Sequence, residues 1–160
     1  VIAWKPEEVD IILIVVDADD VESQRRADLQ RALQTIQSNH LDAAEQEICD
    51  RSASGLAIRN FETWLLADTQ TISRFLGVEL QQLDNLEDLN DTKKILESAI
   101  EKSTYSTIGN SNQRPLQIRW KLASQIDLAI VKTRCPNGYA TFVQSLLVVA
   151  KVVDKITSVS

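Results

Sequence analysis

The hydrophobic pattern near the start of the chain predicts a buried strand that ends in acidic residues. Six apolar residues, Ile11 to Val16, run directly into Asp17-Ala18-Asp19-Asp20. A short run rich in β-branched residues is typical of a strand that is buried on both faces of a parallel sheet. In open α/β sheets, ligands bind outside the carboxyl ends of the strands. We therefore expect Asp17 and Asp19 at a ligand-binding edge.

The remaining pattern alternates between helical periodicity and polar breaks. In the first half it predicts an amphipathic helix over 21–39, a crossover to a parallel strand over 55–59, and a helix over 61–75 that Gly77 ends. In the second half it predicts a loop with a short turn over 79–91 and three helices, over 92–102, 116–133 and 139–156. A loop over 103–113 is expected to connect the first two of these helices, and a tight turn over 136–138 the last two. The C-terminal half is thus expected to be helical. Asp91 is expected to cap the helix over 92–102.

Length and apolar content predict one domain over residues 1–160, in which residues 1–78 form an α/β core and residues 79–160 a mainly helical extension. Large aromatic side chains are expected in its core, namely Trp64, Trp120 and Phe142. No stretch is long and apolar enough to predict a membrane span.

Composition narrows the chemistry that this chain can perform. The net charge of −6 argues against holding nucleic acid by bulk electrostatics, although a nuclease with a local basic strip is compatible with it. Two isolated cysteines and one histidine argue against zinc sites and against a Ser-His-Asp triad. Reduced cysteines predict a cytoplasmic protein.

The carboxylates carry the most specific chemical signal. Asp17 and Asp19 at one strand end would repel each other unless a hard cation such as Mg²⁺, or Mn²⁺, neutralised them. The alternative is that these aspartates only cap the following helix.

A second acid and a base lie at the next junction of strand and helix. Glu62 is expected at the same edge as the two aspartates, where three carboxylates can hold one or two Mg²⁺ ions, and Arg59 can stabilise charge on a phosphate. The alternative for Glu62 is an ordinary acid in the first turn of a helix, paired with Arg59.

Four sequence elements together resemble a known bacterial family, domain of unknown function 4276. They are the strand that ends in VDADD, the stretch RNFETWLLAD, the DTKK at 91–94 and a late RCP-x-x-Y-x-x-F segment. Members of that family are similar to Toprim-type domains of topoisomerases, primases and overcoming-lysogenization-defect nucleases. The resemblance spans about residues 10–147, and the stretch from Glu62 to Asp68 is its most specific part.

The resemblance implies a Toprim-like, Rossmann-like parallel sheet in which Asp17 and Asp19 match a metal-binding DxD pair. Toprim domains also carry a catalytic Glu after an earlier strand, which residues 1–8 do not supply. Either the sheet is truncated at the N-terminus here and that Glu lies upstream, or the site is incomplete and the chain is inert alone. A nuclease subunit acting on nucleic acid in a defence or mobile-element setting, with an ATPase partner, is the implied function.

Two other functions fit the residues. The first is an interaction module that keeps the fold without catalysis and forms a homodimer or partner surface through the apolar stripe 146–153. The second is a phosphatase-like hydrolase with Asp17 as nucleophile and Asp19 as general acid.

Overall fold

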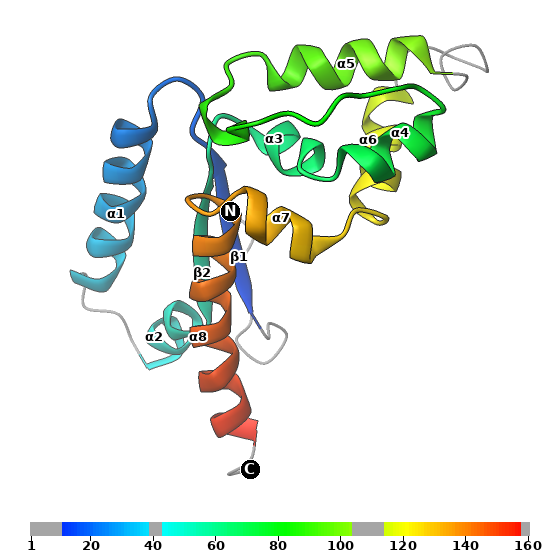
Figure 1. The fold of residues 1–160 in the computed structure, drawn as a ribbon. Helices are drawn as coiled ribbons and strands as arrows, with labels where there is room; N and C mark the ends of the chain where they lie inside the picture. The colour runs from blue at the N-terminus through cyan, green and yellow to red at the C-terminus, as the bar shows by residue number, and fades with distance from the viewer. Residues whose placement is uncertain (1–10, 39–42, 104–113, 158–160) are drawn as a thin grey trace.

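The sheet consists of two parallel strands joined through two helices (Figure 1). The computed structural model describes residues 11–38, 43–103 and 114–157. β1 (Ile12–Asp17) and β2 (Ser52–Ala57) pair from Ile12 opposite Ser52 to Asp17 opposite Ala57, and α1 (Glu22–Ser38) and α2 (Ala43–Asp50) connect them. The predicted crossover between parallel strands is confirmed.

β1 is less buried than its apolar sequence predicts. The Leu13 side chain is 54% exposed, and the other residues of the strand are half-buried. Within the described residues β1 pairs with β2 alone, and α1 is largely exposed. The expectation of a strand buried on both faces is wrong here, because α1, the helix that follows β1, is itself largely exposed and leaves the face of β1 that carries Leu13 open.

β2 begins and ends earlier than the predicted strand over 55–59. Its bounds follow the ladder to β1, which starts at Ser52 and ends at Ala57. Beyond it, Arg59 takes a left-handed conformation with φ 66°, which ends the regular strand. Pairing with β1, rather than local apolarity, therefore sets the limits of β2.

The helix predicted over 61–75 is two helices, α3 (Phe61–Leu66) and α4 (Thr69–Leu76). Asp68 separates them, because its carboxylate caps α4 and accepts a hydrogen bond from the Thr71 amide at 3.0 Å. Gly77 ends α4 with φ 67°, as predicted.

The described part of the C-terminal half is helical, as predicted. It contains the 3₁₀ turn η2 (Leu86–Asp88) and the helices α5 (Thr92–Lys102), α6 (Arg114–Ala123), α7 (Leu128–Arg134) and α8 (Tyr139–Thr157). The predicted turn at 136–138 is present. Asp91 precedes α5, but its carboxylate makes no cap and instead accepts a hydrogen bond from Lys94 Nζ at 2.8 Å. Except for Ser103, the predicted loop 103–113 lies outside the described residues.

The helix predicted over 116–133 is also two helices, and again an aspartate starts the second. Asp127 caps α7 by accepting a hydrogen bond from the Ala129 amide at 2.8 Å. The Asp127 amide in turn donates to the second carboxylate oxygen of Asp68 at 3.0 Å. The two helix breaks are therefore hydrogen-bonded to each other.

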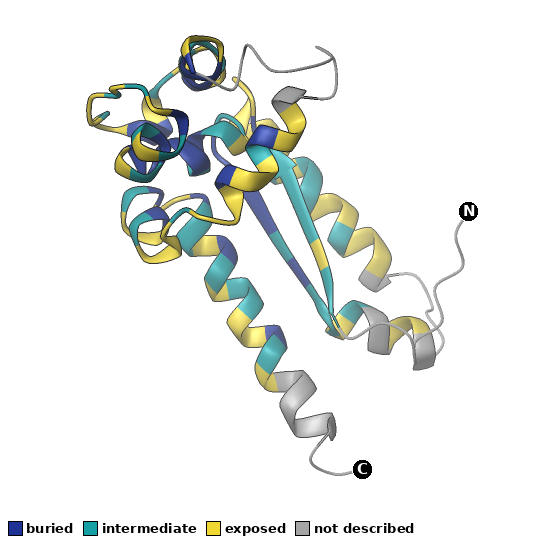
Figure 2. Ribbon diagram, turned by 90° about the vertical axis from the view of Figure 1, so that its right-hand side faces the viewer, coloured by how far each residue is buried: buried dark blue, intermediate teal, exposed yellow. Residues whose placement is uncertain are grey.

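The largest hydrophobic cluster lies among the helices α3 to α7 (Figure 2). Its fully buried members include Leu66, Ile72, Leu96 and Leu122. These residues come from both sides of residue 78, so the first helices after the sheet share one core with the C-terminal half.

A smaller cluster lies between β2 and α8, where Ala53, Phe142 and Val149 meet. Phe142 is buried, as predicted, and Trp64 is half-buried against both clusters. The expectation for Trp120 is wrong, because its side chain is 69% exposed.

Removing the charge of Asp68 should destabilise the fold. Burial raises the pKa of this carboxyl, but the hydrogen bonds from the Asp127 and Thr71 amides outweigh that effect and hold it below its ordinary value of 3.8. Asp68→Asn places an amide NH₂ against one of these donors, so we expect a loss of about 1–3 kcal/mol in the free energy of unfolding.

The loss of stability caused by Asp68→Asn should depend on pH. A lowered folded-state pKa means that the ionised Asp68 contributes stability above its ordinary pKa, and that this contribution is lost as the pH falls through the lowered value. Urea unfolding of both proteins should show the full difference at pH 7 and a shrinking difference below about pH 4. A difference that stays constant with pH would contradict the role of the charge.

Gly55 is required where α8 crosses β2. A Cβ added there would lie 2.6 Å from Phe142 Cβ. Elsewhere in a strand, Gly→Ala stabilises by roughly 0.5–1 kcal/mol because glycine is the more flexible residue. Here we expect Gly55→Ala to lower the free energy of unfolding by about 1–3 kcal/mol, so the sign of the change in urea unfolding tests the contact.

Candidate functional site

Asp17 connects the end of β1 to the start of α3. Its Oδ1 accepts a hydrogen bond from the Phe61 amide at 3.0 Å. This is a contact across 44 residues rather than a cap on the helix that follows Asp17 in sequence, α1. The capping alternative therefore does not describe Asp17.

The carboxyl group of Asp17 lies in a negative local field. Burial raises its pKa most, and repulsion from Glu62 and then from Asp19 raises it further. The Phe61 amide and the Lys93 ammonium act in the opposite direction without cancelling the rise. Glu62 and Asp19 therefore both lie near enough to Asp17 to act on its charge.

The backbone at this edge is strained at two candidate residues. Asp19 has φ 50° and Arg59 has φ 66°, and the Asp19 amide donates to the Arg59 carbonyl at 2.7 Å in an isolated bridge. A left-handed non-glycine residue costs of order 1–3 kcal/mol, and such residues cluster at functional sites. The Asp19 carboxylate is exposed and lies 3.9 Å from Arg25.

Arg59 and Glu62 do not pair with each other. Arg59 Nη1 donates to Asp20 at 2.9 Å, and Nη2 donates to the Asp88 carbonyl at 3.5 Å. Glu62 Oε1 instead lies 3.1 Å from Nε of Arg119 on α6, and Arg119 also contacts Glu97 on α5. Glu62 is therefore more than an exposed first-turn acid, since a cation from another helix holds it.

Basic groups lie beside the carboxylates. A pocket of about 500 Å³ is lined by Asp19 and Arg59 together with Lys93 and Lys94 from the first turn of α5. The helix dipole disfavours cations at the start of a helix, so the neighbouring acids stabilise the charges of the two lysines there. The edge thus combines acids, which suit a hard cation, with bases, which suit a phosphate.

A buried polar cluster, which the sequence analysis missed, fixes the start of α5 against α3. The side chain of Asn60 accepts hydrogen bonds from the Thr63 amide at 3.2 Å and from the Thr92 hydroxyl at 3.0 Å. Both threonines are fully buried. Asparagine is a common helix-capping residue, so the local sequence could have predicted that Asn60 caps α3. Its contact with Thr92, 32 residues away, could not be predicted locally.

The three predicted acids do not form a closed metal centre. Among the described residues, no three His, Cys, Asp or Glu side chains lie close enough to hold an ion together. Mg²⁺, however, is often bound through only one or two protein carboxylates, with water and substrate oxygens completing its shell. Asp17, whose pKa stays raised, and the exposed acid Asp19 fit that mode.

The late RCP segment serves the packing of the helices. Arg134 donates from Nη1 to the Ala67 carbonyl at 2.8 Å and from Nη2 to the Leu83 carbonyl. Cys135 is buried, and the buried Glu87 holds the following turn through hydrogen bonds from the amides of Asn137 and Gly138. These contacts hold α7 and the turn after it against the neighbouring helices.

The overall class is a mixed α/β protein with a small parallel sheet and a mainly helical remainder. Residues 3–147 match the family model described as Domain of unknown function (DUF4276), so the chain belongs to this family. No curated protein and no solved structure matches the chain. Within the described ranges, no helix has the length and apolarity needed to cross a membrane.

Cys135 should react with a thiol reagent only when the protein is unfolded. Burial, followed by repulsion from Glu87, raises the pKa of Cys135 to about 12, so almost none of it is thiolate at pH 8. We expect a disulfide reagent to modify Cys135 in Cys49→Ser protein only in denaturant. Rapid modification of that variant under native conditions would contradict the burial of Cys135.

Proposed function

We propose that this protein is a Toprim-like, Mg²⁺-dependent or Mn²⁺-dependent phosphoryl-transfer domain, and that it serves as a nuclease subunit. The observation that supports the proposal best is that Glu62 and Asp19 lie close enough to Asp17, at the carboxyl edge of a parallel sheet, to repel its charge and raise its pKa beyond the effect of burial. A divalent cation would relieve that repulsion. The same edge carries cations that suit a phosphate.

Each residue has a distinct role in this proposal. Asp17 and Asp19 hold the ion, and Glu62 is an added ligand or positions the substrate. The bound ion would activate a water and neutralise charge on the phosphate. Arg59 and Lys93 offer positive charge to the phosphate from the basic side of the edge.

The substrate and partners follow from the family resemblance. Nucleic acid is the proposed substrate, and an ATPase is the proposed partner in a defence or mobile-element setting in the cytoplasm. With a net charge of −6, contact with nucleic acid must depend on local groups such as Lys93, Lys94 and Arg119.

A second candidate function is a non-catalytic interaction module that forms a homodimer or binds a partner protein. It is favoured by exposed apolar side chains on α8, where Leu147 is 53% and Val148 is 65% exposed. In this case the sheet edge would keep its structure without binding a cation.

Calorimetric titration of Mn²⁺ and Mg²⁺ separates these functions. We expect binding to the unmodified chain, and a loss of at least tenfold in affinity in Asp17→Asn and Asp19→Asn, because each removes one negative ligand. Asparagine keeps an acceptor for the Phe61 amide at position 17 and tolerates the left-handed backbone at position 19. Glu62→Gln should weaken binding only if Glu62 is a ligand.

Asp84→Asn is the matched control, since it removes one exposed carboxylate from the loop before η2, outside the candidate site. Absence of binding to a folded chain, or equal losses in all variants, would overturn the metal site. Cleavage of a labelled oligonucleotide supports the nuclease, whereas hydrolysis confined to a small phosphate monoester would favour the phosphatase-like reaction.

A further inference from the structure

Arg119 on α6 contacts acidic side chains from two other helices. Its Nε lies 3.1 Å from Oε1 of Glu62 in the first turn of α3, and its Nη2 donates a hydrogen bond to Oε1 of Glu97 on α5 at 3.2 Å. α6 packs against both α3 and α5. One cation therefore joins two acids that lie far apart in the chain.

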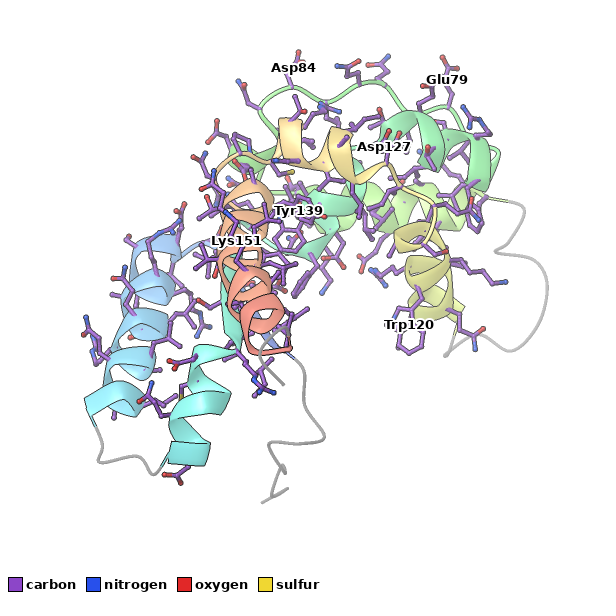
Figure 3. The ribbon with its side chains drawn as sticks, turned by 90° about the horizontal axis from the view of Figure 1, so that it is seen from below. Glu79, Asp84, Trp120, Asp127, Tyr139 and Lys151 are labelled. Atoms are coloured by element: carbon purple, nitrogen blue, oxygen red, sulfur yellow. The ribbon has the colours of Figure 1, made fainter. Side chains whose placement is uncertain are left out.

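The orientation of α6 holds Arg119 in this position. Ile118 and Leu122 of the same helix are buried in the largest hydrophobic cluster. Trp120, the residue after Arg119, is mostly exposed, and Figure 3 shows its ring projecting clear of the ribbon. The Arg119 side chain is only 19% exposed, and that of Glu62 is 14% exposed. Arg119 is thus a largely buried cation rather than a solvated one.

The contact between Arg119 and Glu62 depends on charge. Nε is buried and makes no hydrogen bond to any of the described residues, although it lies 3.1 Å from the carboxylate. Such a contact is an ion pair rather than a directed hydrogen bond. When an ion pair is largely withdrawn from water, removal of one charge leaves the other buried without compensation. We therefore expect Glu62 to remain with Arg119 while both are present.

The pair lies at the carboxylate edge of the sheet. An apolar pocket of about 520 Å³ is lined in one part by the charged side chains of Asp17, Glu62 and Arg119. Glu97, the other acid that Arg119 contacts, lines the pocket of about 500 Å³ that also contains Asp19. Arg119 thus contacts one acid from each of the two pockets that the proposed metal ligands line.

A divalent cation and Arg119 would compete for Glu62. Mg²⁺ binds its oxygen ligands at about 2 Å, so an ion on Oε1 of Glu62 would lie no more than about 5 Å from Nε of Arg119. At that distance a divalent ion and a guanidinium repel each other strongly where water is largely excluded. Glu62 is therefore a poor metal ligand as long as Arg119 is charged beside it.

We propose that Arg119 is a positioning residue that holds Glu62 out of the coordination shell of the divalent cation, so that Asp17 and Asp19 remain the carboxylate ligands. The guanidinium occupies the place that a second cation would take beside Glu62. This inference rests on the proposed function for the metal site itself, and it assigns to Glu62 a role other than metal ligand. Glu62 then acts on the site through its charge, because it repels the charge of Asp17.

Calorimetric titration of Mn²⁺ into variants of the ion pair tests this proposal. We expect Arg119→Gln to tighten Mn²⁺ binding by about tenfold, because it removes a repelling charge and releases Glu62 as a further carboxylate ligand. A purely structural arginine would give no such increase. Arg119→Lys keeps the charge and should bind Mn²⁺ as the unmodified chain does.

The double variant Arg119→Gln, Glu62→Gln removes the pair as a unit. Because it leaves the net charge of the pair unchanged, its Mn²⁺ affinity should lie within about threefold of the unmodified chain. It also tests the proposal if Arg119→Gln alone does not fold, since it leaves neither partner of the pair charged. Arg31→Gln is the matched control, because Arg31 pairs with Asp28 on α1 outside both pockets, and it should leave the affinity unchanged.

Two outcomes would overturn the role of Arg119. The first is unchanged or weaker Mn²⁺ binding by a folded Arg119→Gln protein, with circular dichroism and thermal unfolding as the check on folding. The second is a loss of tenfold or more in the double variant, which would mean that Glu62 is a ligand despite Arg119.

The same titrations keep this inference separate from the proposed function. Binding by the unmodified chain that Asp17→Asn weakens, without an increase in Arg119→Gln, would retain the metal site and refute the role of Arg119. Binding by Arg119→Gln alone, lost in the double variant, would support the role of Arg119 and refute the proposed metal site of the unmodified chain. Absence of binding in every variant would refute both.

Discussion

The buried carboxylate of Asp68 is the interaction on which the helical part of this structure depends. It accepts one hydrogen bond from the first turn of α4 and one from the amide of Asp127, which itself begins α7. Because Asp68 is only 3% exposed, losing either donor would leave one buried carboxylate oxygen without its hydrogen bond. Arg134 reinforces the same point by donating to the adjacent Ala67 carbonyl. The directions of α3, α4 and α7 are therefore set together.

This arrangement also determines where the candidate site lies. With α3 ended at Leu66, the first turn of that helix stays against the carboxyl end of β1, where the Phe61 amide meets Asp17. The hydrogen bonds of Asn60 with the buried Thr63 and Thr92 then bring the start of α5, and with it the basic residue Lys93, to the same edge. The acids and bases of the site are thus positioned by polar contacts in the surrounding fold.

The most specific part of the family signature has a divided role. Within the stretch from Glu62 to Asp68, Trp64 joins the two hydrophobic clusters and lines the apolar pocket, while Asp68 holds the helix breaks together. Glu62 is the residue of this stretch that belongs to the candidate site, because it acts electrostatically on Asp17 and pairs with Arg119. One short stretch of this sequence therefore combines residues that the fold requires with a residue of the candidate site.

The sequence by itself determined the two strands with a helical crossover between them, most helix limits and the glycine that ends α4, because hydrophobic periodicity and a glycine at a helix end are local signals. The tertiary structure decided the rest. The two long helices that the sequence predicts break at Asp68 and Asp127, which are joined by a hydrogen bond from the Asp127 amide to the Asp68 carboxylate. Glu62 takes its partner from α6, and Trp120 is mostly exposed instead of lying in the core. Each of these outcomes depends on contacts between residues far apart in the chain, which no local pattern records.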